Sequence, residues 1–129
     1  MKKSRHILII WGDDNQRSTL ATLLRMHEYS VTHSGDAFHG LNMIEKNEQS
    51  PFSLVIIGPG PSTLDSWEVV PLVRSKYSKE DLPIIFVTTK PKGDEQEDLR
   101  KTGTEDLINV LLRQINNNVI YKNIKGLIG

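Results

Sequence analysis

The sequence predicts an α/β protein whose parallel sheet is covered by helices on both faces. Short apolar runs of strand length recur along the 129 residues, and stretches with helical periodicity separate them. Strands that alternate with helices in one small domain are typical of βαβ units, which build a doubly wound parallel sheet. Five strands account for the whole chain, so we expect one domain over residues 1–129.

Composition excludes several classes of function. Sixteen basic and sixteen acidic residues give a formal net charge of zero, so we expect no direct binding to nucleic acid or to a membrane surface. The chain has no cysteine, which excludes disulfides, thiolate metal sites and a cysteine nucleophile. The apolar run in the opening MKKSRHILIIW is too short for a signal peptide, and acidic residues follow it, so we expect a cytoplasmic protein.

The first half of the chain predicts two strand–helix pairs. Residues 6–11 (HILIIW) form the first expected strand, and YSVTHSG at 29–35 forms the second. In the helix between them, Leu20, Leu23, Leu24 and His27 share one face, and we expect a solvent or core-edge role for the histidine. A second helix follows over 36–47 with Asp36 as its N-cap. Its expected buried face contains Ala37, Phe38, Leu41 and Ile44.

The second half continues the alternation. Residues 53–57 and 82–89 form the third and fourth expected strands. The helix between them begins near Asp65 and ends near Ser75, and Pro71 should kink or shorten it. The segment DEQEDLRKTG at 94–103 predicts a short helix.

The tail allows two interpretations. Residues 104–110 (TEDLINV) form a last strand, followed by an amphipathic helix over 111–126, or residues 104–116 form one helix. The apolar residues of the segment fit both patterns, so local periodicity does not choose between them.

The end of the third strand carries no reactive side chain. Ligands of open α/β sheets bind just outside the carboxyl ends of the strands, and here the run LVII leads into Gly58 and Pro59. A phosphate cradle needs successive backbone N–H donors, and Pro59 and Pro61 each remove one. We therefore interpret GPGPS as a rigid connection, and Ser62, Thr63 and Ser66 as turn and cap residues.

These segments together resemble the receiver domain of bacterial response regulators. The stretch from Ile7 to Asn47 is similar to the first half of a receiver, LPIIFVTTK to its fourth strand, and KTGTEDLINV to the approach to its fifth strand. The resemblance covers nearly the whole chain and implies a five-stranded sheet in the flavodoxin-like order 2-1-3-4-5. It also favours the strand interpretation of 104–110. The expected core is Leu8, Ile10, Leu20, Leu24, Val55, Ile57, Ile85, Val87 and Ile108.

Receivers phosphorylate themselves on an aspartate. An acidic pair holds Mg²⁺, and a hydroxyl and a lysine bind the phosphoryl oxygens. In the alignment Trp11 and Gly12 replace the acidic pair, Gly58 replaces the aspartate, and Val110 replaces the lysine. Thr88 keeps the hydroxyl, whereas Leu111 replaces the following proline and Leu107 the aromatic switch residue. The resemblance thus implies a degenerate site of Trp11, Gly12, Asp13, Asp14, Gly58, Thr88 and Val110, with no catalytic residue, metal or cofactor.

Three aspartates near this site have two interpretations each. Asp13, Asp14 and Asp65 could hold a displaced metal ion, or they could serve the adjacent helices. Asp13 has Gln16 at capping-box spacing, and Asp65 has Glu68. A carboxylate cluster without a third ligand holds Mg²⁺ poorly. Capping is the interpretation that the spacing favours. Trp11 either packs into the core or also plugs the former metal site.

We therefore expect a non-enzymatic pseudo-receiver that acts by phosphorylation-independent protein contact, for example as the regulatory domain of a transcription regulator. The resemblance implies a protein partner or a homodimer through residues 90–103 and 111–125. Two alternatives stay open. One is a receiver phosphorylated through Asp13, Asp14 or Asp65, and the other is a flavodoxin-like nucleotide- or flavin-binding protein.

Overall fold

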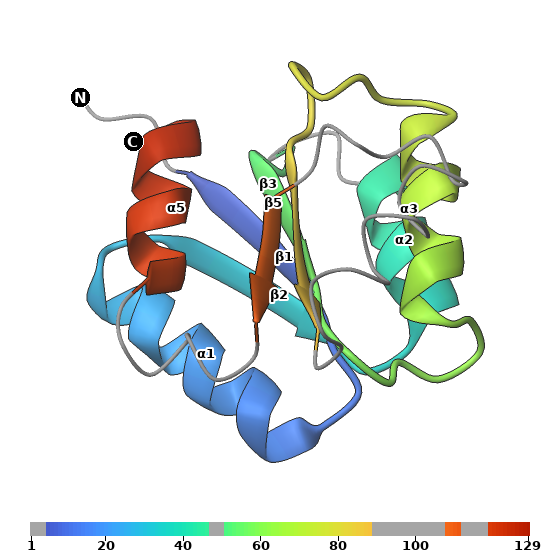
Figure 1. The fold of residues 1–129 in the computed structure, drawn as a ribbon, viewed down its shortest axis with the longest axis horizontal. Helices are drawn as coiled ribbons and strands as arrows, with labels where there is room; N and C mark the ends of the chain where they lie inside the picture. Colours follow the sequence, from blue (N-terminus) through green and yellow to red (C-terminus); the bar gives the residue numbers. More distant parts are fainter. Residues whose placement is uncertain (1–4, 47–50, 89–107, 112–118) are drawn as a thin grey trace.

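The computed structural model describes residues 5–46, 51–88, 108–111 and 119–129. The elements in chain order are β1 (His6–Ile10), α1 (Asp14–Met26), β2 (Ser30–Ser34), α2 (Ala37–Lys46), β3 (Leu54–Ile57), α3 (Ser66–Arg74), β4 (Ile84–Thr88), β5 (Ile108–Leu111) and α5 (Val119–Ile128) (Figure 1). The helix expected over 94–103 lies outside the described residues.

The strands form one parallel sheet in the order β2-β1-β3-β4-β5. The order 2-1-3-4 that the sequence predicts is confirmed, and β5 pairs with β4 from Ile85–Ile108 to Thr88–Leu111. A strand at these positions contradicts the alternative of one helix over 104–116. Ile10 lies opposite both Ser34 of β2 and Ile57 of β3, so these three strands end at the same level.

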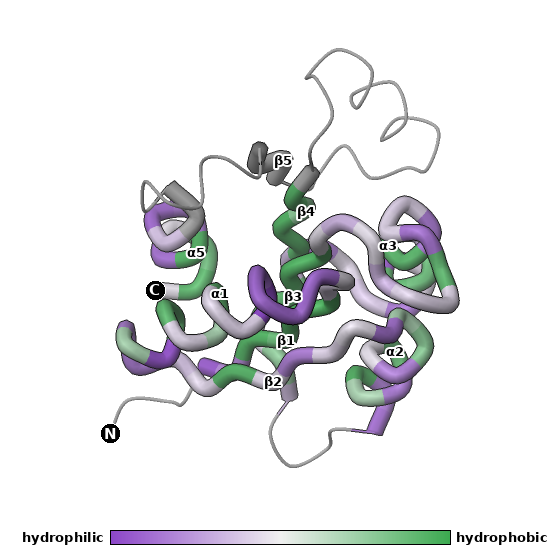
Figure 2. Tube along the Cα trace, turned by 90° about the horizontal axis from the view of Figure 1, so that it is seen from below, coloured by the Kyte–Doolittle hydropathy of each residue, from purple (hydrophilic) through white to green (hydrophobic). Residues whose placement is uncertain are grey.

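The helices cover the sheet from two sides. Alternate residues of a strand point to opposite faces, and each face here has its own cluster of buried side chains. The cluster beneath α1 and α5 contains Ile7, Ile9, Leu20, Leu24, Ile56 and Ile124. The cluster beneath α2 and α3 contains Leu8, Ile10, Val55, Ile57, Val69 and Val73. Figure 2 shows the hydrophobic strands β1, β3 and β4 enclosed between these layers.

The expected core is confirmed wherever its side chains are described. Eight of its nine members are at most 1% exposed, and the side chain of Ile108 lies outside the described residues. The prediction of a buried Phe38 is wrong, since this side chain is 56% exposed. Gly40 explains the difference: a Cβ there would lie 2.6 Å from Ile10, so α2 approaches the sheet on its Ala37–Gly40 side and Phe38 points away.

Two further details of the helices concern His27 and Pro71. His27 is exposed and caps the C-terminus of α1, where its ring stacks on Tyr121 of α5 at a centroid distance of 3.8 Å. Pro71 lies inside α3 without ending it, and the helix runs on to Arg74. In the part of the chain that the structure describes, no helix is long and apolar enough to cross a membrane.

Candidate functional site

The candidate site lies where β1 and β3 end side by side. Trp11 follows β1 and Gly58 follows β3, and both continue the hydrogen bonding of the sheet. The backbone N–H of Trp11 donates to Ser34 O at 3.0 Å, and that of Gly58 donates to Ile10 O at 2.8 Å. The indole of Trp11 is fully buried and is among the largest side chains of the core. The sheet thus delivers a tryptophan and a glycine to the level where a parallel sheet presents its ligand-binding groups.

The Trp11 ring lies directly against the backbone of Gly58. A Cβ atom built on Gly58 would lie 2.1 Å from Cδ2, 2.3 Å from Cε3 and 2.7 Å from Cε2 of the indole. The ring is oriented by its Nε1–H, which donates to Oε1 of Gln16 at 2.9 Å. Because real Cβ contacts are never this short, Gly58 is the residue that the buried indole permits.

The loop after β3 also folds onto the loop after β1. The N–H of Gly12 donates to Pro59 O at 3.0 Å, and a Cβ on Gly12 would lie 1.9 Å from Gly60 O. Gly60 itself has a φ of +70°, a backbone conformation that glycine adopts without strain. An acidic side chain at position 12 is therefore incompatible with this path of the loop.

A guanidinium group occupies the polar side of this site. Arg17 is 12% exposed, and its Nη1 donates to the carbonyl oxygen of Trp11 at 2.7 Å. Its Nη2 forms an ion pair with Asp14 at 2.6 Å. Its Nε donates to Nδ1 of His33 at 3.0 Å. The carbonyl oxygen of Trp11 is thus bound by the guanidinium group of Arg17.

Asp13 and Asp65 act as helix caps, as the spacing predicts. Asp13 Oδ1 accepts from the N–H of Gln16 at 2.8 Å at the start of α1. Asp65 Oδ1 accepts from the N–H of Trp67 at 3.3 Å at the start of α3. The side chain of Gln16, expected to complete a capping box with Asp13, accepts from Trp11 instead.

These groups do not fit a divalent cation. Mg²⁺ needs several oxygen ligands, of which carboxylates are the usual protein component. Asp13 is engaged as a cap and Asp14 is paired with Arg17. Across residues 5–46, 51–88, 108–111 and 119–129, no three His, Asp or Glu side chains come together in a way that could hold a metal ion.

A second set of contacts ties the β3–α3 loop to the β2–α2 loop. Ser62 N–H donates to Gly35 O at 2.8 Å, and Ala37 N–H donates to Ser62 O at 3.0 Å. The hydroxyls of Ser62 and Thr63 donate to the Asp36 carboxylate at 3.3 and 3.2 Å. Backbone donation from His39, followed by these hydroxyl bonds, lowers the pKa of Asp36. Sequence reasoning identified Asp36 only as a cap, because its loop partners are distant in the chain and carry no local signal.

His33 is neutral in this arrangement, because its Nδ1 accepts the hydrogen bond from Arg17. Burial lowers the pKa of His33, and the nearby Arg17 and Arg25 lower it further, against an opposite effect of Asp14. The unfolded chain therefore takes up a proton near the ordinary pKa of about 6.5, whereas the folded chain does so only at lower pH. The contribution of neutral His33 to the free energy of unfolding is thus fully present above a pH of about 6.5, and it is lost as the pH falls through the lowered pKa.

We expect the urea midpoint of the wild type to fall more steeply between about pH 8 and pH 5 than that of His33→Gln. Glutamine removes the titrating group while its amide oxygen can still accept from Arg17. The histidines at positions 6, 27 and 39 are the same in both proteins, so the difference in slope isolates His33. Parallel midpoint curves for the two proteins would contradict this assignment.

The structure brings together three of the sequence-predicted site residues, Trp11, Gly12 and Gly58, with Asp13 and Asp14 at the start of α1 beside them. Thr88 ends β4, and its backbone pairs with Leu111, next to Val110, in β5. The side chains of Thr88 and Val110, and all of Leu107, lie outside the described part of the chain.

Comparison with known proteins places the fold. No protein-family model matches the chain, and no curated protein matches it. Solved structures match over nearly the whole length. The chemotaxis protein CheY4 of Vibrio cholerae has a TM-score of 0.80 at 18% identity, covering 97% of this chain and 99% of its own. A two-component response regulator from Clostridium difficile has a TM-score of 0.79 at 19% identity, covering 96% and 95%.

A third neighbour was solved as a complex. The response regulator TrrA of Thermotoga maritima, solved in complex with Mg(2+)-BeF, has a TM-score of 0.75 at 22% identity, covering 96% of this chain and 99% of its own. The chain therefore has the fold of the receiver domains of two-component response regulators.

Proposed function

We propose that this chain is a pseudo-receiver, a receiver-fold module that takes up no phosphoryl group and acts by protein contact. The observation that carries the proposal is the fully buried Trp11 ring, which fills the space that any side chain at position 58 would need. In the resemblance to receivers, position 58 is that of the phosphorylated aspartate. With the Trp11 ring in this place, position 58 has no room for the side chain of an aspartate.

The surroundings of this ring support the same proposal. Phosphoryl transfer to a carboxylate depends on a metal ion and cationic groups that compensate the developing charge. Here the Trp11 carbonyl faces Arg17, Asp14 is paired with that arginine, and Asp13 caps α1. The alternative of phosphorylation through displaced acids would require these pairings to be broken before a metal could bind.

The second alternative, a nucleotide- or flavin-binding protein, needs a phosphate-binding loop at the strand ends. The loop after β3 instead turns its polar groups to its neighbours. Ser62 and Thr63 donate to Asp36, and the oxygen of Pro59 accepts from Gly12. Because the polar groups of this loop are bound within the chain, the module binds a protein partner without a ligand-dependent switch, for example as the regulatory domain of a transcription regulator. The contact face implied by the resemblance, residues 90–103 and 111–125, stays a prediction and lies mostly outside the described residues.

We expect no mass increase when the chain is incubated with acetyl phosphate and Mg²⁺ and its intact mass is measured. A receiver that carries the acceptor aspartate, treated in parallel, provides the positive control. Addition of one phosphoryl group to the wild type would overturn the proposal. Loss of that addition in Asp13→Asn or Asp14→Asn would then identify the displaced acid. A native mass spectrum of the purified chain tests for a bound nucleotide or flavin, which would favour the other fold-related function.

A further inference from the structure

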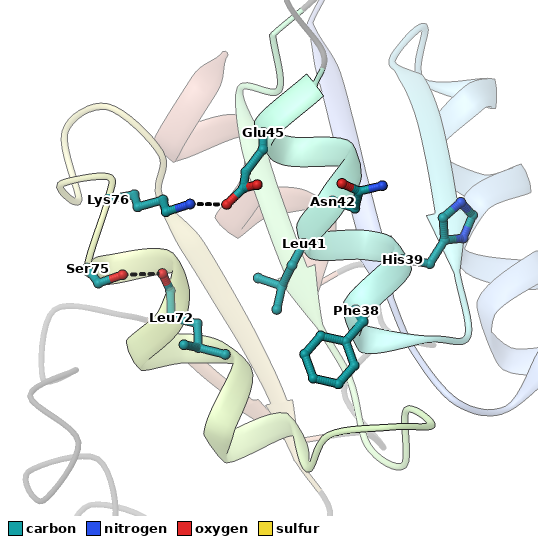
Figure 3. A pocket seen from close by; sticks show the side chains of 8 residues that line it. All are labelled: Phe38, His39, Leu41, Asn42, Glu45, Leu72, Ser75 and Lys76. Carbon is teal, nitrogen blue, oxygen red and sulfur yellow. Dashed lines mark hydrogen bonds and ion pairs between the residues drawn. The ribbon is translucent and has the colours of Figure 1, made fainter.

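A groove of about 600 Å³ runs between α2 and α3 on the outer surface of the molecule (Figure 3). Across the described residues four large hydrophobic side chains are exposed, and two of them line this groove. Phe38 of α2 is 56% exposed and Leu72 of α3 is 45% exposed. Leu41, half-buried, lies between them in the groove. Apolar surface gathered in a groove, rather than scattered singly, is typical of a contact site.

The two helices present the same pattern to this groove. On α2, Glu45 follows Leu41 by four residues, and on α3, Lys76 follows Leu72 by four residues, just beyond the end of the helix. Four residues are about one helical turn, a rise of about 6 Å. Glu45 and Lys76 form an ion pair across the groove, and their side chains are 49% and 58% exposed. Each side of the groove thus has a leucine followed, one helical turn later, by a charged residue. The charge is negative on the α2 side and positive on the α3 side.

We propose that this groove binds the same groove of a second copy of the chain. Both helices return from parallel strands along one face of the sheet, so they run in the same direction. A two-fold axis along the groove then places α2 of each copy opposite α3 of the other. Leu41 faces Leu72 of the partner subunit, and Glu45 faces Lys76 of the partner subunit. Opposite charges meet twice, as an isologous contact requires.

The overall charge and the size of the face define what kind of dimer this is. The formal net charge of zero adds no long-range repulsion between two copies. Helices of 10 and 9 residues, side by side, give a face about 15 Å long and about 20 Å wide. Its area of about 300 Å² is smaller than the area of about 800 Å² that stable complexes bury per partner. The dimer is therefore transient and depends on concentration. The inference rests on the proposed function, because it takes the second copy as the protein partner of a pseudo-receiver that binds without phosphorylation.

Sedimentation velocity over a wide range of protein concentration, without a phosphodonor, tests the dimer. We expect reversible dimerisation of the wild type and at least about a tenfold weaker dimer for Phe38→Asp or Leu72→Asp. Met26→Asp is the matched control: Met26 is 75% exposed but belongs to α1, on the other face of the sheet. A wild type that stays monomeric at the highest concentration would overturn the proposal, as would a dimer that Met26→Asp weakens equally.

Charge reversal provides the sharper test. Glu45→Lys alone and Lys76→Glu alone should each weaken the dimer, because like charges then meet at both symmetric positions. An equimolar mixture of the two variants should form a heterodimer with about wild-type affinity, since every contact between the copies is again Lys against Glu. Within each variant the same two residues repel, so only contact between copies explains the recovery. No recovery in the mixture would overturn the proposal.

Lys122→Glu on α5 separates this face from the face implied by the resemblance, since Lys122 is exposed and lies within 111–125. If this variant abolishes dimerisation while the groove variants do not, the second copy binds at α5 and the proposal is wrong. Failure of the proposed function has a different signature, namely phosphoryl addition from acetyl phosphate. The two outcomes are therefore distinguishable.

Discussion

Gly58→Ala is expected to destabilise the fold by about 3 kcal/mol or more, although it adds a single methyl group. The new Cβ would lie within 2.1–2.7 Å of three atoms of the Trp11 indole. That ring is fully buried in the cluster beneath α1 and α5, and its Nε1–H is bound to Gln16. The ring can yield only by moving into close-packed neighbours, which is costly in a protein interior.

Urea unfolding of both proteins, followed by circular dichroism, measures this effect. Gly126→Ala is the matched control, because a Cβ at this position in α5 meets nothing within 4 Å. There the same substitution should leave stability unchanged or raise it by up to about 1 kcal/mol, since alanine favours a helix. Equal midpoints for Gly58→Ala and the wild type would contradict the packing of Trp11 against Gly58.

The contact between Trp11 and Gly58 also bears on any attempt to restore the phosphorylation site of a receiver by mutation. Gly58→Asp alone should fail to accept phosphate because it cannot fold around Trp11, before the absence of a metal site becomes relevant. Adding Trp11→Asp, Gly12→Asp and Val110→Lys does not solve the problem, since a Cβ at position 12 would lie 1.9 Å from Gly60 O. We expect this fourfold variant to be less stable than the wild type and to show no phosphoryl addition by intact mass. Rapid addition would show that the β3–α3 loop moves aside easily.

Trp11→Ala is expected to cost about 3–5 kcal/mol, the range for truncating a large aromatic side chain in a core. The indole is fully buried, and its removal also ends the hydrogen bond to Gln16. Chemical denaturation again provides the measurement. A loss below about 1 kcal/mol would mean that the ring is not a packing element of the core.

The double variant Trp11→Ala/Gly58→Ala separates packing from other effects. Once the indole is absent, the methyl group added at position 58 has space, so the two losses should not add. We expect the double variant to be about as stable as Trp11→Ala alone. Trp67→Ala is the control partner, since Trp67 packs on Phe86 in the cluster beneath α2 and α3, at a centroid distance of 4.2 Å. Its effect should add to that of Gly58→Ala without coupling.

Local patterns determined the elements and most of the core of this protein. Buried parallel strands are apolar on both faces, so they read as continuous runs such as LVII and PIIFV. Capping depends on residues within one turn, which is why Asp13 and Asp65 could be identified as caps from spacing alone. The two interpretations of the tail were equal by periodicity, and the resemblance favoured the strand that the structure has at 108–111.

The tertiary structure alone decided how distant segments meet. Phe38 had the spacing of a core residue, but the close approach of α2 at Gly40 directs it outward, into the groove with Leu72. Gln16 had the spacing of a capping-box partner, but the indole of Trp11 offers it a buried donor.

The same holds at the candidate site. The sequence shows that Trp11 and Gly58 are both unusual for a receiver, yet not that the ring of Trp11 requires glycine at position 58. That requirement arises because β1 and β3 are neighbours in the sheet and end at one level, so that a single volume must be shared by the residues that follow them. Volume shared between segments far apart in the chain leaves no periodic trace in the sequence, because periodicity reports only which face of an element is buried.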